Sequence, residues 1–452
     1  MENKQVDISL KLERIGFGKF QIVALAILCL RYFSYSSTTS LVAILEPYLR
    51  CHWSLSYINA AWIVLPEAIT KIIGSILLGK LSDIYGRRKI LILASVANSY
   101  LALLYSLSSS VLLLSIIRGF IGLVSSSTLI IFTYTMEILP LSGRKFMSLF
   151  ELAFCLGCGY GIVVAGVTLK YLNWRWFDTF AETIPIALST FLVFYLPESP
   201  RYLSAAGKRE EAEKSLERIA EMNGCEKGYV PLEEACAEAE YQEEGEKRKL
   251  ESECKLSRRE LAERIALLSL LKFYGDVVSG TMRYGSMQFG ENSDVLGCGK
   301  CFQNLTYKYR WSVETAVLLS VFTLYWFLNN LTRKLTLKIL VVYLAVCLVP
   351  FYWPLRGWPL LMALAFTVLG SSTLNNVLLV YRAELIPTSS RTFGCGLSDA
   401  FGHFGFMFGQ IIALYLYHVS IPLSFGLVHG LTVLCFVAVF TALIETKYDF
   451  LT

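Results

Sequence analysis

Ionisable side chains interrupt several long apolar stretches of this 452-residue chain. A charge at membrane depth costs about 3 kcal/mol, so such a residue is a candidate for a binding or transport role. The candidates are Arg31, Glu67 with Lys71, Glu151, Lys272 with Asp276, and Asp399 with His403. No Ser/His/Asp constellation or metal-ligand cluster accompanies them, so we expect solute binding rather than an enzyme, with no metal and no cofactor.

Two of these groups have an alternative interpretation. Glu67 and Lys71, and likewise Lys272 and Asp276, are four residues apart and would lie on one face of a helix. Each pair could simply neutralise itself. Tyr274, between Lys272 and Asp276, is a further candidate for solute contact.

The two single charges are interpreted differently. Arg31 is too central in its apolar stretch to reach the membrane surface, so we expect it, with nearby Tyr35, to face a cavity. Glu151 lies at the start of its stretch, and we expect a structural ion pair with Arg144 or Arg118.

Composition places these residues in a membrane. Apolar residues make up 55% of the chain and charged residues 17%, against about 25% charged in a soluble protein. The runs 90–117, 146–169 and 395–417 are nearly uncharged, and each approaches or exceeds the roughly 20 residues needed to cross a bilayer as a helix. The net charge of +5 is too small to indicate nucleic-acid binding.

We predict an all-α membrane protein with twelve spanning helices. Helices and closed barrels are the lipid-compatible structures, and the apolar runs are too long for barrel strands. The predicted spans are 20–45, 57–79, 90–108, 111–134, 146–169, 179–196, 262–284, 312–331, 337–353, 358–380, 394–417 and 421–443.

Lys and Arg are more frequent in the links after spans two, four, eight and ten than in the opposite links. This bias predicts that both termini are cytoplasmic. The charged segment 204–261 falls on the same side, where we expect a loop with short helices. It separates an amino-terminal bundle (1–203) from a carboxy-terminal bundle (262–452).

An internal repeat supports this division. The pattern Tyr-x-x-Glu-x-x-Pro-x-x-x-Arg occurs twice, with Glu137 and Arg144 in the first copy and Glu384 and Arg391 in the second. The same offset of 247 residues relates Asp83 to Asn330 and Arg87 to Lys334. The pattern indicates two six-helix halves with a solute site between them, an arrangement found in transporters.

The segment Gly79–Lys89 follows span two. Its glycines permit a tight turn, and Asp83, Arg87 and Arg88 could form charge-assisted bonds between the halves. We expect these residues, with Glu137, Arg144, Glu384 and Arg391, to form a gate that rocking of the halves opens. In the alternative, the basic residues merely set the orientation in the membrane.

These segments resemble the major facilitator superfamily. Gly79–Lys89 matches its loop signature, and Pro197–Leu203 resembles its sugar and organic-ion branches. Asn173–Trp176, Cys51–Trp53 and Ile444–Lys447 are similar to the organic cation/anion transporters and the synaptic-vesicle-glycoprotein-related transporters. The resemblance implies a monomeric major facilitator fold that carries a small organic solute by alternating access, at the plasma membrane or an intracellular vesicle. The second copy departs from the loop signature, so its gate should be looser or stabilised by other contacts.

The resemblance also suggests the solute. Span eleven carries an acidic residue in the family's cation carriers and a basic one in its anion carriers, and alignment from Arg391 places His403 there. The stretch Phe33–Ser40 has hydroxyl groups where related transporters carry carboxylates. With Arg31 nearby, we favour an anion or zwitterion, bound also by Asn376 and Asp276 and driven by its own gradient, exchange, or protons through His403.

Two other functions stay open. Pro197–Leu203 suggests a sugar carrier, although Phe273–Asp276 stands where sugar carriers would show a glutamine pair. A receptor or scaffold that keeps the fold but transports nothing is the other alternative.

The outer loop between spans seven and eight contains the glycosylation sequon at Asn304. Cys51, Cys298 and Cys301 share that side, where one disulfide of undetermined pairing is expected. The apparent phosphate loop Gly74–Lys80 is followed by Leu81 and lies at the end of an apolar span, so we reject nucleotide binding.

Overall fold

The computed structural model describes residues 8, 11–55, 57–224, 258–291, 300–353, 355, 357–386, 391–413 and 421–442, and these are almost entirely helical, with no strand among them. The first group of helices is α2 (Lys19–His52), α3 (Tyr57–Tyr85), α4 (Arg87–Ser106), α5 (Val111–Ser125), α6 (Thr128–Ile138), η1 (Leu141–Met147), α7 (Ser148–Tyr171), α8 (Trp174–Asp178), η2 (Thr179–Thr183) and α9 (Ile184–Val193). The others are α10 (Pro200–Ala205), α11 (Arg209–Asn223), α13 (Arg258–Glu291), α14 (Lys300–Asn330), α15 (Arg333–Leu348), η3 (Val349–Tyr352), α16 (Trp358–Leu385), α17 (Arg391–Ile411) and α19 (Ile421–Ala442).

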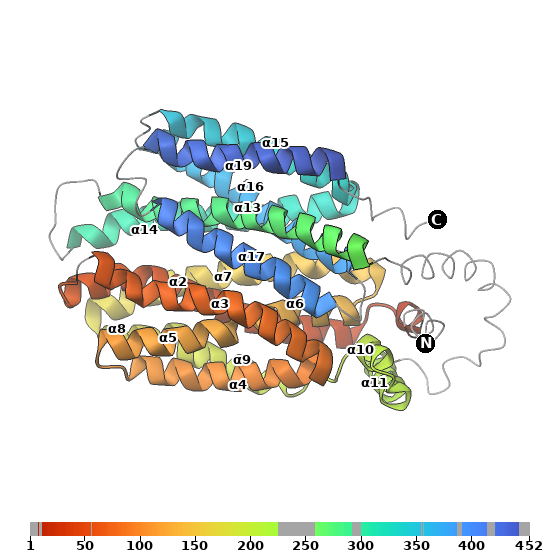
Figure 1. Cartoon of the computed structure of the whole chain (residues 1–452). Helices are drawn as coiled ribbons and strands as arrows, with labels where there is room; N and C mark the ends of the chain where they lie inside the picture. Colours follow the sequence, from red (N-terminus) through yellow and green to blue (C-terminus); the bar gives the residue numbers. More distant parts are fainter. Residues whose placement is uncertain are drawn as a thin grey trace.

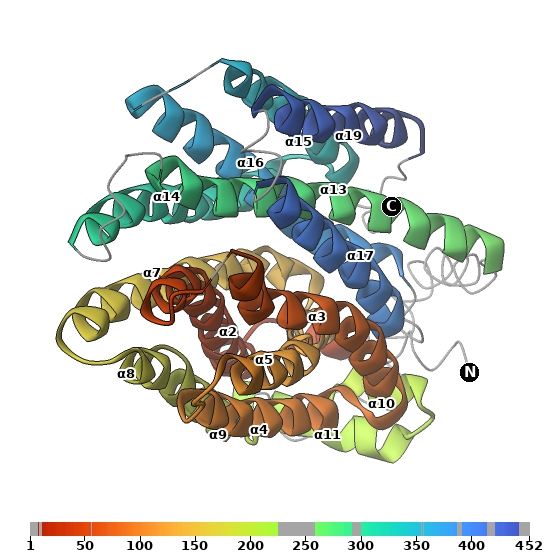
Figure 2. The same ribbon diagram turned by 60° about the vertical axis from the view of Figure 1, so that its left-hand side comes forward.

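The helices form two bundles that lie side by side (Figures 1 and 2). The first contains α2–α9 and the second α13–α19. Helices α10 and α11 lie at one end of the molecule, here named the α11 end, where α2 begins and α17 starts (Figure 1). The two bundles correspond to the two halves of the sequence repeat.

Each bundle provides six crossings, and the predicted twelve-helix fold is confirmed. Nine described helical stretches are long and apolar enough to span a membrane. The remaining crossings within the described residues are α17, α19 and the α8–η2–α9 stretch. In the α8–η2–α9 stretch a π-helical turn interrupts the helix where Asp178 and Glu182 are buried.

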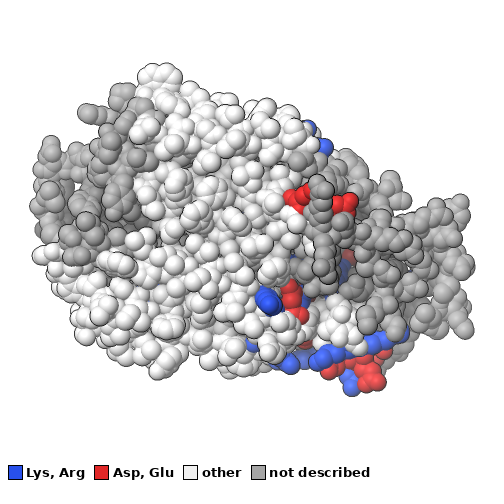
Figure 3. Space-filling model, viewed as in Figure 1, with Lys and Arg blue, Asp and Glu red and all other residues white. Residues whose placement is uncertain are grey.

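The surface distribution of side chains fits a lipid environment. Charged side chains gather towards the α11 end, whereas the flank along the helices carries uncharged ones (Figure 3). Large apolar side chains such as Leu93, Phe191 and Val346 are exposed on the outside of the bundles. A soluble protein would bury them, whereas in lipid they need no other partner.

Helices meet closely along two lines between the bundles. In the first, named the α3–α17 seam, a Cβ on Gly396 would collide with the main-chain oxygen of Ser75, and a Cβ on Gly79 would lie 2.8 Å from that of Thr392. In the second, the α7–α14 seam, Cys155 Sγ donates to the main-chain oxygen of Glu314 at 3.3 Å. Small residues permit this closeness, as in other membrane bundles.

The two halves repeat one structural contact. Arg87 starts α4, pairs with Glu137 at 3.2 Å and donates from Nη1 to the main-chain oxygen five residues before it. Arg333 starts α15, pairs with Glu384 at 3.6 Å and donates in the same way to Leu328. The counterpart of Arg87 is therefore Arg333, and the predicted match with Lys334 is wrong by one residue.

The link between spans seven and eight is shorter than predicted. Helix α13 continues to Glu291 and α14 begins at Lys300, so Asn304 falls within a helix rather than a loop. Cys298 and the side chains of Asn304, Cys51 and Cys301 lie outside the described residues, so glycosylation and the disulfide stay predictions.

Candidate functional site: a charged cavity between the bundles

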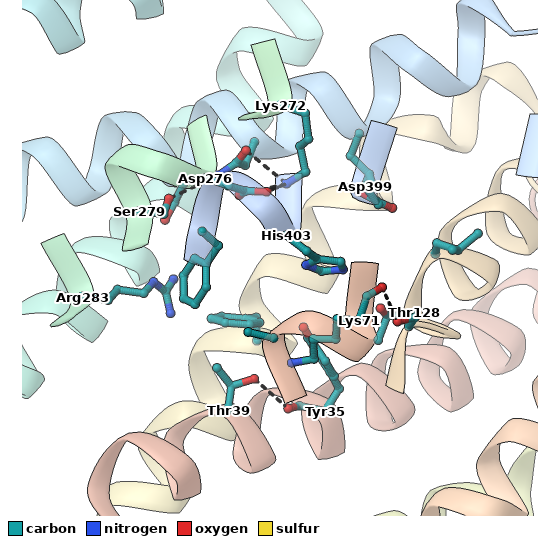
Figure 4. Close-up of a pocket in the computed structure, with 18 of the residues that line it drawn as sticks. Tyr35, Thr39, Lys71, Thr128, Lys272, Asp276, Ser279, Arg283, Asp399 and His403 are labelled. Carbon is teal, nitrogen blue, oxygen red and sulfur yellow. Dashed lines mark hydrogen bonds and ion pairs between the residues drawn. The ribbon is translucent and has the colours of Figure 1, made fainter. Parts of the chain in front are cut away.

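A cavity of about 230 Å³ lies between the two bundles, and side chains of both bundles line it. The first bundle contributes polar side chains from α2, α3, α6 and α7, and the second from α13, α16 and α17. Figure 4 shows the side chains that converge on it. The polar lining includes Tyr35, Thr39, Glu67, Lys71, Glu151, Lys272, Asp276, Ser279, Arg283, Asn375, Asn376, Arg382, Asp399, His403 and Gln410.

Acid–base pairs occupy three places on the cavity wall. Lys71 Nζ lies 2.6 Å from Glu67 on α3. Lys272 Nζ lies 2.9 Å from Asp276 on α13. The third pair joins Arg382 of α16 to Asp399 of α17. The interpretation that the pairs on α3 and α13 neutralise themselves is therefore correct, and it does not exclude solute contact because both pairs face the cavity.

Further polar contacts hold these pairs in place. Lys272 Nζ also donates to Asn375 Oδ1 at 3.2 Å, and Asn375 Nδ2 donates to Ser279 Oγ at 3.3 Å. Behind Glu67, the guanidinium of Arg118 pairs with Glu67 at 3.0 Å and with Glu182 at 3.2 Å. The cavity wall of each bundle is thus a connected polar network, which restricts the positions of its charged ends.

His403 lies on α17 between two lysines. Lys71 belongs to the first bundle and Lys272 to the second, and the imidazole lies between them in Figure 4. Both lysine charges act on the imidazole, as do Asp276 and Asp399. Three nitrogen groups from both bundles therefore converge where an anionic group of a solute could bind.

Four of the six predicted solute-binding residues line the cavity: Tyr35, Asp276, Asn376 and His403. The Tyr35 ring also lies 5.2 Å from Lys71 Nζ. The other two predicted residues, Arg31 and Tyr274, do not line it.

Arg31 is buried inside the first bundle instead. The cavity-facing stripe of α2 is Tyr32, Tyr35 and Thr39. Arg31 lies at the edge of this stripe, and its Nε donates to Ser95 Oγ of α4 at 3.2 Å. A central position along a span does not determine which way a long side chain turns.

Tyr274 points into the second bundle. It is two residues from both Lys272 and Asp276, which places it on the opposite face of α13. There Thr432 Oγ1 donates to its hydroxyl oxygen at 3.0 Å.

Sequence reasoning missed two charged cavity residues and misplaced a third. Arg283 continues the stripe of Lys272, Asp276 and Ser279 at helical spacing, a signal that could have identified it. Arg382 was assigned to a cytoplasmic link, and no local spacing connects it with Asp399. Glu151 contacts Ser320 Oγ of α14 at 3.3 Å, whereas Arg118 pairs with Glu67 and Glu182.

The predicted gate residues lie at the α11 end, and one of them makes a contact between the bundles. Asp83 reaches the other bundle, since its Oδ2 accepts a hydrogen bond from the Phe393 main-chain nitrogen at 2.8 Å. Arg87 pairs with Asp83 at 3.0 Å and with Glu137, both in its own bundle. Arg88 donates from Nη2 to the main-chain oxygen of Phe194, again in its own bundle.

The second copy of the predicted gate includes contacts within its own bundle. Arg391 donates from Nε to the main-chain oxygen of Ile386 at 3.1 Å, and Glu384 holds Arg333 as described above. Thr332 Oγ1 accepts from the Leu335 main-chain nitrogen at 3.3 Å and caps α15. The side chain of Arg144 lies outside the described residues.

The segment after span six supports the first copy. Glu198 accepts hydrogen bonds from the main-chain nitrogens of Arg88 at 3.0 Å and Ser199 at 3.1 Å. Burial raises the pKa of this carboxyl above its ordinary value, although the two hydrogen bonds oppose that shift. Nearby, the Tyr202 ring lies 4.4 Å from the Arg87 guanidinium.

Curated relatives match nearly the whole chain. It is 27% identical to a Mus musculus protein named "Putative transporter SVOPL", over 99% of this chain and 93% of that protein. It is 26% identical to the synaptic vesicle 2-related protein of Bos taurus, over 96% and 80%. A match to organic cation/carnitine transporter 7 of Arabidopsis thaliana is 29% identical but covers 49% of this chain and 44% of that protein.

Solved structures share the fold. The proton:xylose symporter XylE of the major facilitator superfamily, bound to 6-bromo-6-deoxy-D-glucose, superposes with a TM-score of 0.71 at 20% identity. The superposition covers 95% of this chain and 96% of XylE. The sequence model of the family "Sugar (and other) transporter" matches residues 22–452. The chain therefore belongs to the sugar (and other) transporter family, within the major facilitator superfamily, and is a multi-pass membrane transporter.

Proposed function

We propose that this transporter carries small organic ions, anions or zwitterions in particular, by alternating access of the central cavity. The observation that carries the proposal is the convergence of Lys71, His403 and Lys272 on one cavity from both bundles. A carboxylate bound there would contact both halves at once. Its binding energy could then favour the occluded state through which the halves must pass.

The charge balance of the cavity favours a zwitterion over a simple anion. Lys71, Lys272 and Arg382 on the cavity wall are matched by Glu67, Asp276 and Asp399 in the three ion pairs. A solute with one group of each sign could engage both without leaving a net charge in the membrane. The name of the Arabidopsis relative includes carnitine, a zwitterion, which makes this molecule a suitable probe.

A sugar carrier is the second candidate, and the family name and XylE favour it. Asn375 and Asn376 could bind sugar hydroxyls, whereas the three ion pairs on the cavity wall would be superfluous for a neutral solute.

We also propose that both termini and the α11 end lie in the cytoplasm, because Lys and Arg are more frequent in the links on that side of the membrane.

Uptake into vesicles reconstituted with the purified protein tests these assignments. The panel contains carnitine, benzoate, tetraethylammonium and xylose, each radiolabelled. We expect carnitine or benzoate to be taken up and xylose to be excluded. Uptake of xylose alone would establish the sugar carrier, and uptake of none by a folded protein would support a non-transporting role.

His403→Gln connects uptake to the cavity. No ion pair is broken by this change, so the fold should persist, but the imidazole is lost from the site. We expect the apparent affinity for the accepted ion to fall about tenfold, as for loss of one hydrogen bond to a charged group. Lys208→Gln, just before α11, where the lysine side chain is 50% exposed, is the control and should behave as the wild type.

A further inference from the structure

Glu151 is a buried carboxylate held between the bundles. It lies on α7 and lines the cavity. Ser320 Oγ of α14 donates to Glu151 Oε1 at 3.3 Å, and the side chain of Asn376 on α16 also hydrogen-bonds the carboxylate. Glu151 therefore contacts the second bundle through two neutral groups.

The other cavity carboxylates have closer cationic partners. Glu67, Asp276 and Asp399 are each in a direct ion pair. Glu151 forms no such pair among the described residues. Its environment therefore differs from that of every other carboxylate on the cavity wall.

The charged and titratable groups facing Glu151 come from four helices. Tyr32 faces it from α2, Arg283 from α13, Glu314 from α14 and Cys155 from α7 itself. The positive charge of Arg283 acts on Glu151. Among the carboxylates that attract Arg283, Glu314 acts more strongly than Glu151. Two carboxylates thus face one guanidinium.

Whether Glu151 can remain charged depends on whether water reaches the α7–α14 seam. An uncompensated carboxylate at membrane depth costs a few kcal/mol. Water in an open cavity would stabilise the charge, but closure of the seam removes that water. Binding one proton then removes the charge, and the resulting carboxyl can both donate and accept hydrogen bonds with neutral neighbours.

We propose that Glu151 is a proton-binding site of the α7–α14 seam. The carboxylate takes one proton from the medium while the cavity is open on one side. The carboxyl group remains neutral during closure and returns the proton to the medium after the cavity opens on the other side. His403 has charged neighbours of both signs, Lys71 and Lys272 as well as Asp399 and Asp276, so it lacks the neutral surroundings of Glu151, and we assign it to the solute.

Proton binding itself is independent of the proposed solute, whereas its coupling to flux rests on the proposed function. The first experiment therefore needs no solute. Infrared difference spectra of the purified protein in lipid, recorded between about pH 5 and about pH 8, report the C=O stretch of protonated carboxyl groups. We expect a band that disappears as the pH rises.

Variants assign the band to its residue. Glu151→Gln should abolish it, Glu151→Asp should shift it, and Ser320→Ala, which removes a neutral partner without removing a titratable group, should retain it. A band that persists unchanged in Glu151→Gln would overturn the proposal. Glu151→Asp keeps the test valid if the glutamine variant fails to fold.

The second experiment tests coupling, with carnitine as the probe. Glu151→Gln should retain carnitine exchange between loaded vesicles and medium but lose accumulation driven by an imposed pH gradient. Loss of exchange, without any titrating band in the wild type, would show that Glu151 binds the cationic group of the solute and would overturn the proposal. A Glu151-dependent band without transport of any probe would support the proton site and refute only the proposed function.

Discussion

Gly396→Ala would disturb the closed α11 end directly. The new methyl group would overlap the main-chain oxygen of Ser75 across the α3–α17 seam. Backbone cannot move aside as a flexible side chain can, so α3 and α17 must separate. Overpacking of this kind costs about 1–3 kcal/mol.

The clash acts on one conformation only. Alanine also favours a helix over glycine by about 0.5–1 kcal/mol, but α17 remains helical whether the seam is closed or open, so this gain cancels. The clash exists only in the closed state. The population of that state should therefore fall about 5- to 150-fold relative to the state open at the α11 end.

Spin labels at Tyr85 and Phe393, both exposed near the α11 end, measure this shift. The distance distribution between the labels should move to longer values in Gly396→Ala. Gly166→Ala on α7 is the matched control, because nothing lies within 4 Å of its Cβ position. If both variants keep the wild-type distribution, the seam does not depend on the close approach at Gly396.

Two further changes test the buried ion pairs of the first bundle and Glu198, which lies just before α10. Arg118→Ala leaves the buried Glu67 and Glu182 without their shared guanidinium and should destabilise the fold by about 3–5 kcal/mol, measured by thermal unfolding in detergent; Arg209→Ala on the exposed face of α11 should change stability by less than about 1 kcal/mol. Burial raises the pKa of Glu198 in the folded protein, so the unfolded chain loses this proton at a lower pH than the folded protein does. The contribution of Glu198 to the free energy of unfolding therefore falls as the pH rises from the ordinary pKa of glutamate towards the raised pKa. Glu198→Gln should flatten that part of the stability profile, and an unaltered profile would contradict it.

The two lines of contact between the bundles lie beside different chemistry. Next to the α3–α17 seam, His403 of α17 lies between Lys71 of α3 and Lys272 of α13, which suits a solute carboxylate. In the α7–α14 seam, a carboxylate meets neutral groups and an arginine already attracted to a second carboxylate. Solute and proton would thus use separate seams of the same rocking structure.

The sequence by itself determined the number of spans, the two halves and the family. These properties depend on the length of apolar runs and on repeated local motifs, which are recorded directly in residue order. The pairs Glu67–Lys71 and Lys272–Asp276 were predictable for the same reason, since four-residue spacing places both members on one helix face.

Only the tertiary structure decided which polar residues meet. Arg382 pairs with Asp399, Glu151 meets Ser320, and Asp83 binds the Phe393 main chain. Each contact joins different helices, so it depends on how those helices rotate and pack rather than on local spacing. The same rotation turned Arg31 into the first bundle and Tyr274 into the second, because every span has one face towards the cavity and others towards its neighbours.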